Sequence, residues 1–253
     1  MIVDGKMIPL AQLQDMAKSL LGGGASADEP GGLLSDKWGL WARGNYSFGK
    51  KDANSQSPSF KADQWALVGG ADYRLSDNSV IGGSLAYGNA SVNFKPSGEG
   101  ALDTESWAVS LYGSMYAAKS FYVDGVVNVA NSSYDARRNI TYVDGAGLVD
   151  VDASGTTDGL TWSGGLSGGY DFLVGGFTLS PNVGFFYVDT SIEGFTEKGA
   201  AGLNLIYDEQ NFKSLTGNLG LRVAYAWNTS WGVLLPHLRV DFVREFEIGR
   251  AHV

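Results

Sequence analysis

Three features of the sequence bear on chemistry, and the first is a serine. Gly165-Leu166-Ser167-Gly168-Gly169 matches the G-x-S-x-G pattern of a nucleophile elbow, in which a tight strand-to-helix turn exposes the serine to a histidine and an acid. Here the pattern lies in a glycine-rich alternating stretch that predicts a strand, and the chain's two histidines are His237 and His252. Small residues that let a strand curve explain the run, so we predict no serine nucleophile.

The second feature is an acidic stretch and the third is the absence of cysteine. Asp150-Val151-Asp152 begins like the calcium loop of an EF-hand, but Thr161 stands where that loop needs a bidentate glutamate. The chain has no cysteine, which excludes thiolate nucleophiles and cysteine-based zinc sites. Its 27 acidic residues outnumber its 18 lysines and arginines, which argues against nucleic acid as a partner. The sequence therefore predicts no catalytic residue, no metal ion and no cofactor.

The elements that must hold these residues are nine stretches between Trp38 and Glu247 in which apolar and polar residues alternate. A period of two is typical of a β-strand with one apolar and one polar face. The chain has no run of about 18 apolar residues, which excludes a membrane-spanning helix. Tight turns near 76–78, 118–120, 174–176 and 228–230 alternate with long polar loops near 50–61, 94–104, 136–157 and 191–212. This order predicts an up-and-down antiparallel sheet.

Alternation alone does not say which face is buried, because a soluble β-sandwich has the same period. Three features favour a barrel whose apolar face points outward into lipid. Aromatic residues such as Trp65, Trp107 and Trp227 stand near strand ends, where interfacial girdles form. The stretches are long enough for a tilted bilayer crossing, and short turns alternate with long loops as in bacterial outer-membrane barrels. We predict an all-β fold: an up-and-down antiparallel transmembrane β-barrel with a short N-terminal helix.

The same alternation predicts which side chains line the interior of the barrel. They are the polar and charged residues opposite the apolar face: Arg43, Asp72, Arg74, Asp124, Arg222, His237, Arg239, Asp241 and Glu245. Both charge signs are present, which favours pairing within a hydrated pore over a selectivity filter. The simpler interpretation is that these residues keep the lumen wet and the strands in register.

Residues 9–21 read as a short helix, since apolar residues recur there at helical spacing. The positions that define its apolar face are Leu10, Leu13, Ala17 and Leu20. Three glycines at 22–24 end it, and a Gly/Ser/Asp/Pro-rich tether follows to Leu34. About 13 residues at 1.5 Å each give about 20 Å, a useful fraction of a bilayer core. A helix threaded through the barrel and a frayed surface helix both fit this composition.

The strands and turns also contain short sequence motifs in a specific order. These are Gly70-Ala71-Asp72-Tyr73-Arg74-Leu75-Ser76-Asp77-Asn78, Gly82-Gly83-Ser84-Leu85-Ala86-Tyr87, Tyr134-Asp135-Ala136-Arg137-Arg138, Gly169-Tyr170-Asp171-Phe172 and Ser230-Trp231-Gly232-Val233-Leu234-Leu235-Pro236, with Arg239-Val240 and Arg244-Glu245-Phe246-Glu247 at the end. Over residues 36–247 they resemble the β-barrel translocator domain of classical, type V autotransporters.

This resemblance implies a twelve-stranded barrel in the outer membrane of a Gram-negative bacterium, surrounded by outer-membrane lipid. It implies that residues 9–21 form a helix inside the pore. It also implies an N-terminal passenger domain carried to the cell surface, with the barrel-assembly machinery and periplasmic chaperones as partners. Self-cleavage between two asparagines of the pore helix, known in some members, is not expected, because the first asparagine here is Asn45, already in a strand.

The chain departs from the resemblance at both ends. It shows nine strands where twelve are implied, so the barrel is expected to be C-terminally truncated, with three further strands beyond Val253. Residues 248–253 do not fit a strand pattern and back-translate to a string resembling a sequencing adapter, which predicts a non-native tail. No signal peptide is visible, which predicts an upstream segment. The expected domains are a pore helix and linker over 1–35, an incomplete barrel over 36–247, and the tail.

The sequence thus predicts a non-enzymatic outer-membrane translocator that secretes or displays a passenger missing from this chain. The alternative is a porin-like passive channel, in which the lumen charges matter and residues 1–35 are incidental. A third interpretation makes the chain the anchor of an upstream adhesin or enzyme. Removing residues 1–34 discriminates the first two. The conductance of a pore plugged by this segment should rise, whereas the conductance of a porin should not change.

Overall fold

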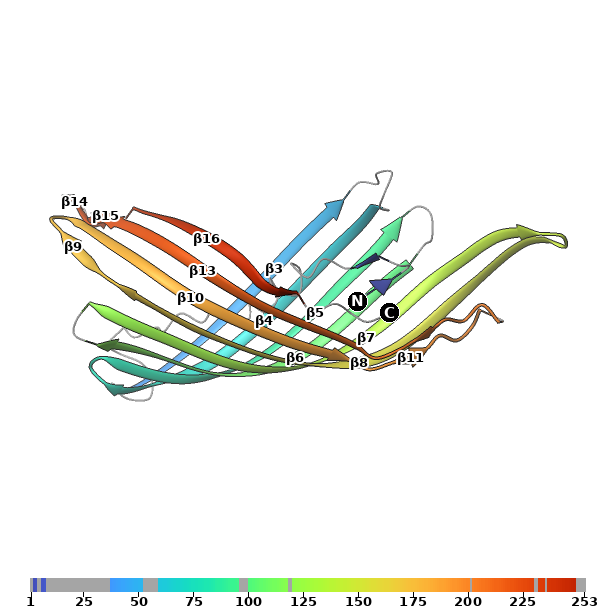
Figure 1. The fold of residues 1–253 in the computed structure, drawn as a ribbon, viewed down its shortest axis with the longest axis horizontal. Helices are drawn as coiled ribbons and strands as arrows, with labels where there is room; N and C mark the ends of the chain where they lie inside the picture. The colour runs from blue at the N-terminus through green and yellow to red at the C-terminus, as the bar shows by residue number, and fades with distance from the viewer. Residues whose placement is uncertain are drawn as a thin grey trace.

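The computed structural model describes residues 2–3, 6–7, 37–51, 59–95, 100–117, 120–200, 202–229, 232–234 and 236–248. One antiparallel sheet dominates, and its strands lie in the order β16-β13-β10-β8-β7-β6-β5-β4-β3, with β9 beside β10 (Figure 1). Its strands are β3 Trp38–Lys51, β4 Ser59–Ser76, β5 Ser79–Lys95, β6 Gly100–Ala117, β7 Phe121–Asp144, β8 Gly147–Tyr170, β9 Phe172–Val174, β10 Phe177–Ile192, β13 Gln210–Tyr225 and β16 His237–Ile248. Three small two-stranded sheets complete it: β1 Ile2–Val3 with β2 Lys6–Met7, β11 Phe195–Thr196 with β12 Ile206–Tyr207, and β14 Trp227–Thr229 with β15 Gly232–Leu234.

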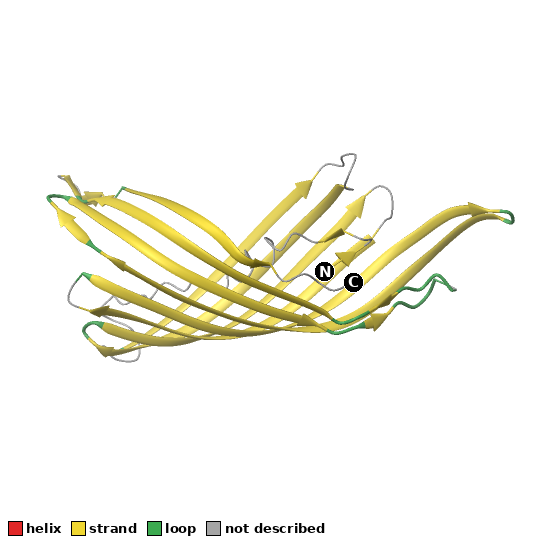
Figure 2. Ribbon diagram, in the orientation of Figure 1, coloured by secondary structure: helices red, strands yellow, loops and turns green. Residues whose placement is uncertain are grey.

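This arrangement confirms the all-β, up-and-down antiparallel fold. Each of the nine strands on the path pairs with its neighbours along the chain, as the alternating short and long connections predict. The sheet curls into a trough, and every described element is a strand, turn or loop (Figures 1 and 2). No helix in the described part of the chain has the length and hydropathy needed to cross a bilayer. The predicted helix at 9–21 lies outside the described residues.

The short connections gather at one end of the strands, called here the short-turn end. Ser76 and Ser79 flank the two-residue turn between β4 and β5, and their hydroxyls lie 2.7 Å apart. The β9–β10 turn needs a glycine at Gly175, because its φ of 63° lies in the left-handed region. The β14–β15 hairpin closes the same end between β13 and β16.

At the opposite end, the hairpin of β7 and β8 projects beyond its neighbours (Figure 1). Each strand has 24 residues, whereas β6 pairs with β7 only as far as Arg138. The predicted polar loop at 136–157 is therefore wrong: these residues form strand on both sides of a turn at 145–146. The reason is visible in the residues. Ile140 and Val151 each stand between two polar residues and pair across the hairpin, as do Tyr142 and Val149.

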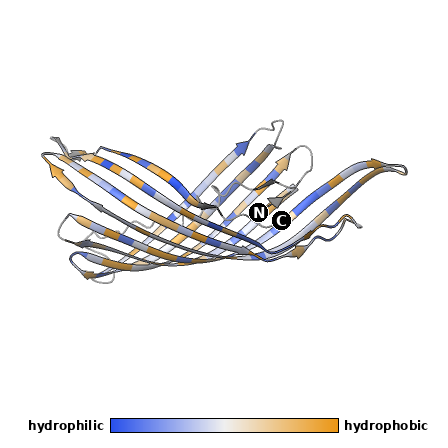
Figure 3. Cartoon of the chain, in the orientation of Figure 1, coloured by the Kyte–Doolittle hydropathy of each residue, from blue (hydrophilic) through white to orange (hydrophobic). Residues whose placement is uncertain are grey.

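The two faces of the sheet differ in the way an outward apolar face requires. Large apolar side chains on one face, called here the outer face, are well exposed: Leu67 59%, Leu85 63%, Trp107 64% and Leu111 63% among them. Residues on the other, inner face are mostly small or polar and buried. Along each strand, apolar and polar residues alternate (Figure 3). The hydrophobic side chains of this chain thus face its surroundings, which is favourable only when those surroundings are hydrocarbon.

Candidate functional site

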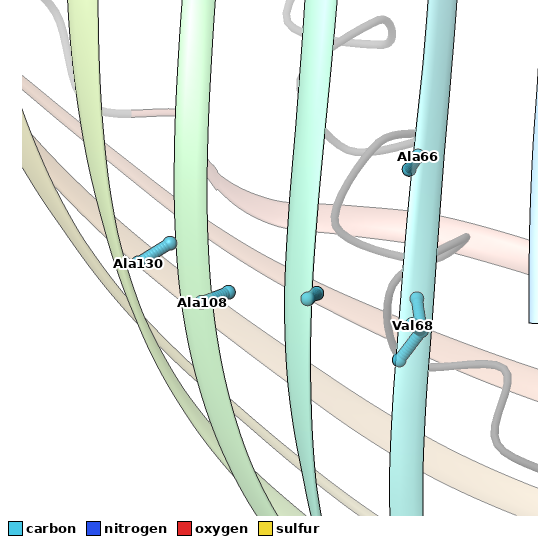
Figure 4. Close-up of a cluster of buried hydrophobic side chains, with 5 residues drawn as sticks. Ala66, Val68, Ala108 and Ala130 are labelled. Carbon is cyan, nitrogen blue, oxygen red and sulfur yellow. The ribbon is translucent and has the colours of Figure 1, made fainter. Parts of the chain in front are cut away.

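The inner face at mid-height carries a cluster of small, buried side chains. Ala66, Ala86, Ala108 and Ala130 form a buried cluster with Val68, and Trp41 packs against it. These residues come from the neighbouring strands β4, β5, β6 and β7 and lie side by side across them (Figure 4). Small side chains keep this part of the wall thin.

All nine polar residues predicted to line the interior lie on this inner face. Their register partners place them there: Arg43 with Val68, Asp72 with Gly82, Arg74 with Val80, Asp124 with Ser167, Arg222 with Arg239, Asp241 with Gly220, His237 with Ala224 and Glu245 with Thr216. Most of them stand near the short-turn end, but they lie on different strands. The structure brings them together in several smaller groups and not in one site.

The most buried of these groups joins three strands through Asp72, a residue that is only 5% exposed. The Tyr112 hydroxyl donates to Asp72 Oδ1. Trp41 Nε1 donates to the Tyr112 hydroxyl at 2.7 Å and approaches Asp72 Oδ1 at 3.3 Å. Gly82 is required beside them, because a Cβ there would lie 2.5 Å from both Asp72 and Tyr112. This network fixes β3, β4 and β6 to one another, a contact between residues up to 71 positions apart.

The other polar groups are smaller pairs spread along the inner face. Asp124 accepts hydrogen bonds from Ser114 at 2.6 Å and from Ser167 at 3.5 Å. Arg239 holds Asp241 through two hydrogen bonds of 2.7 and 3.0 Å, and Glu245 accepts from Ser214 and Thr216 at 2.9 and 3.0 Å. Ser167, the serine of the G-x-S-x-G pattern, is thus a hydrogen-bond donor within β8, near its short-turn end. No group of three or more metal-binding side chains occurs among the residues that the structure describes.

Sequence reasoning missed that the inner face turns apolar at the end opposite the short turns. Leu102, Tyr134, Ile192 and Phe212 form a second buried cluster there, with Val92 and Ala136 packed against it. Gly159 makes room for it, since a Cβ would lie 3.0 Å from Tyr134 and 3.3 Å from Ile192. The sequence of β7 contains a signal of this change. Its large apolar residues mostly occupy odd-numbered positions as far as Val129 and even-numbered positions from Tyr134 onward.

Above this apolar cluster, the loop between β10 and β13 is clamped onto the projecting hairpin. Arg138 Nη2 donates to Glu197 Oε2 at 2.6 Å, and Arg138 Nε donates to Oε1 at 3.2 Å. Both side chains are well buried, at 16% and 6% exposed. Arg138 also donates to the carbonyl of Leu203 at 3.2 Å, and the Leu205 N–H donates to Glu197 at 2.9 Å. A bidentate, charge-assisted pair of this kind is geometrically specific.

Backbone and ring contacts strengthen the clamp. Ser154 and Lys198 exchange backbone hydrogen bonds of 2.9 and 2.8 Å, and Phe195 stacks on Tyr207 with ring centroids 4.6 Å apart. Ala153 and Ala200 are almost completely buried between these segments. The hairpin and the described parts of the loop, 193–200 and 202–209, are therefore held together at the long-loop end of the sheet.

The clamp is expected to open in acid. Burial disfavours the ionised Glu197 carboxyl, but hydrogen bonds from Arg138 and the Leu205 N–H outweigh it and lower its pKa below 4.5. A lowered pKa means that the ionised group stabilises the folded loop above the ordinary value, and that this stabilisation is lost as the pH falls through the folded value. We expect the Leu205 amide resonance to be unchanged from pH 7 to 5 and to shift below about pH 4. An unchanged resonance at pH 2.5 would contradict this role for Glu197.

On the outer face, aromatic rings form a continuous row across neighbouring strands. Trp65 and Tyr87 have ring centroids 5.4 Å apart, and Tyr87 and Trp107 have centroids 4.5 Å apart. Tyr46 lies directly opposite Trp65 and extends the row onto β3. Amphipathic rings of this kind gather at the boundary between hydrocarbon and headgroups. The row marks the long-loop edge of the apolar band.

Comparisons with known proteins bear on this geometry. Residues 40–252 match a family model described as the autotransporter beta-domain. The chain is 26% identical over 197 residues to Outer membrane protein B of Rickettsia prowazekii, a match that covers 77% of this chain and 12% of the relative. It is 26% identical over 189 residues to Lipase 1 of Photorhabdus luminescens, covering 74% and 28%. The translocator domain of NalP from Neisseria meningitidis has the same fold, with a TM-score of 0.70, 17% identity, and coverage of 95% and 80%. The chain spans about an eighth to about a quarter of these two curated relatives.

Proposed function

Because this chain belongs to the autotransporter beta-domain family, we propose that it forms the membrane translocator of a longer protein whose N-terminal passenger it carries to the cell surface. It resides in the outer membrane of a Gram-negative bacterium, as its family and the names of its relatives indicate. The observation that carries the proposal is the two-faced sheet. Its apolar outer face suits lipid, and its thin inner wall of small and polar residues suits a water-filled passage.

The relatives support a division of labour within the longer protein. Outer membrane protein B and Lipase 1 have different names, and both match this chain over a small part of their own length. The match covers 12% of Outer membrane protein B and 28% of Lipase 1. We propose that the shared part is the membrane module and that the particular activity of each protein lies elsewhere. On this proposal the chain itself carries out no covalent reaction, and Ser167, whose hydroxyl donates a hydrogen bond to Asp124 within the sheet, is structural.

We propose further that the nine inner-face residues line the passage and that Leu10, Leu13, Ala17 and Leu20 belong to a helix inside it. The alanine cluster supports this assignment, because a wall of small side chains accommodates a helix without overpacking. The proposed domain division is the one predicted from the sequence, with 1–35 as helix and linker and 36–247 as barrel. Insertion of such a sheet requires the barrel-assembly machinery and periplasmic chaperones, which we propose as partners alongside the passenger.

The experiment that tests this function measures conductance across a planar lipid bilayer. The full chain is expected to conduct little, and deletion of residues 1–34 is expected to raise the conductance to that of an open pore. A matched control replaces residues 1–34 with a Gly/Ser segment of equal length, which should also conduct, since it lacks the helix. Equal conductance of all three proteins would favour the passive porin-like channel and would refute the translocator with an occupied pore.

A further inference from the structure

Two lysines face each other on the outer face at the long-loop ends of β3 and β4. Lys50 and Lys61 are direct register partners, and both are exposed. Their positions share the face of Tyr46 and Trp65, which pair four register rows below. Like charges placed directly opposite each other on one face of a sheet are destabilising. The arrangement is therefore costly unless an anion lies between the two ammonium groups.

In the described part of the chain, no ion pair within 4.0 Å involves Lys50 or Lys61. Asp63 is the carboxylate two residues from Lys61 on the same face, and it accepts the Tyr46 hydroxyl at 3.1 Å. The register row that contains the lysines continues across the sheet without a carboxylate, through Asn93, Ala101, Arg137 and Ser154.

The two lysines stand slightly above the phosphate layer of a membrane, within reach of it through their long side chains. Lys50 lies four residues beyond Tyr46 along β3, which is about 13 Å at about 3.4 Å per residue. A strand tilt of about 40° reduces this to about 10 Å above the aromatic row. The polar layer of one leaflet is about 5–7 Å thick, and lysine stems bend along apolar surface to place their ammonium groups within it. The hydrophilic end of β3 is visible in Figure 3.

An apolar surface for an acyl chain lies directly below the lysines. Phe48 is 80% exposed and Tyr46 is 64% exposed, with ring centroids 6.2 Å apart. Both project from the outer face of β3 between the lysines and the apolar band. A ligand that fits this surface has a phosphate at the height of the lysines and hydrocarbon below it.

We propose that Lys50 and Lys61 form a binding site for a phosphate group of a phosphorylated glycolipid in the outer leaflet. The long loops of outer-membrane barrels are extracellular, so the two lysines lie at the outer leaflet. The phosphate lies between the two ammonium groups and removes their mutual repulsion. The site anchors the β3–β4 edge of the translocator at a fixed depth, and it is separate from the inner face on which the proposed passage depends.

The test measures lipid binding to the full chain folded in detergent micelles, by native mass spectrometry with added phosphorylated lipid A. The Lys50→Gln/Lys61→Gln variant is expected to bind about 25-fold more weakly, because each lysine near a phosphate contributes about fivefold. Lys213→Gln is the matched control, since Lys213 lies at the same end but already pairs with Asp189 at 3.5 Å; it should bind as the parent does. Lys50→Arg/Lys61→Arg keeps both charges and should bind within about twofold of the parent.

Heat-modifiable migration on gels shows for each variant that the sheet has folded. The proposal is overturned if the double glutamine variant, once folded, binds lipid A as tightly as the parent, or if Lys213→Gln weakens binding as much. It is also overturned if dephosphorylated lipid A binds equally well, because the phosphate would then be irrelevant. Equal, lysine-dependent binding of phosphatidylglycerol would replace the glycolipid site with a general attraction to anionic lipid.

Discussion

The Leu111→Arg variant is expected to lose about 2–4 kcal/mol of folding stability in lipid vesicles. Leu111 lies in the middle of the outer apolar band, is 63% exposed, and has Gly83 and Val127 as register partners. Neither partner offers a carboxylate. The guanidinium would therefore lie unpaired in hydrocarbon, or water and lipid headgroups would have to penetrate the bilayer to reach it. Urea titration followed by tryptophan fluorescence in phosphatidylcholine vesicles measures the loss.

Ser133→Arg is the matched control for this experiment. Ser133 is exposed on the same outer face, but it lies beyond the aromatic row and between the register partners Glu105 and Asp158. An arginine there meets carboxylates and the aqueous side of the membrane, so its stability should stay within about 0.5 kcal/mol of the parent. Equal losses in the two variants, or none in Leu111→Arg, would mean that the outer face does not meet lipid.

The Arg138→Ala variant is expected to weaken the docking of the 193–209 loop by about 3–5 kcal/mol. Removing the guanidinium leaves the buried Glu197 carboxylate without its charged partner and also frees the carbonyl of Leu203. The effect should be local, because the strands below are held by their own ladders. Faster hydrogen exchange at the Leu205 amide and faster trypsin cleavage after Lys198 are the expected readouts.

Two further variants separate the buried pair from a general charge effect. Replacing both partners, in Arg138→Leu/Glu197→Leu, should restore most of the resistance to trypsin cleavage after Lys198, since no buried charge is then left unpaired. Exchange at the Leu205 amide is not the readout for this variant, because Glu197 is the acceptor of that amide. Arg137→Ala removes a pair with Asp135 in which the two side chains are 63% and 45% exposed, and should cost less than about 1 kcal/mol. Unchanged exchange at Leu205 in Arg138→Ala would show that the ion pair does not hold the loop.

Period-two patterning made the strands and their faces predictable. In β6, Trp107, Val109 and Leu111 alternate with Ala108 and Ser110, and the structure exposes the first set and buries the second. The error over 136–157 came from reading polarity as loop. There the alternation continues in the opposite phase, because above the membrane the outer face meets water while the inner face packs against the clamped loop.

The sequence by itself determined the order of the long strands and, where the alternation was recognised, the face that each residue occupies, because these depend on local alternation and on the lengths of connections. Only the tertiary structure decided which polar groups meet. Trp41 and Tyr112 are 71 residues apart, and Arg138 and Glu197 are 59 apart. Each pair depends on the cumulative register of every intervening strand and on loop conformation. A shift of one residue in any ladder would move these side chains to opposite faces, so no local pattern encodes their contact.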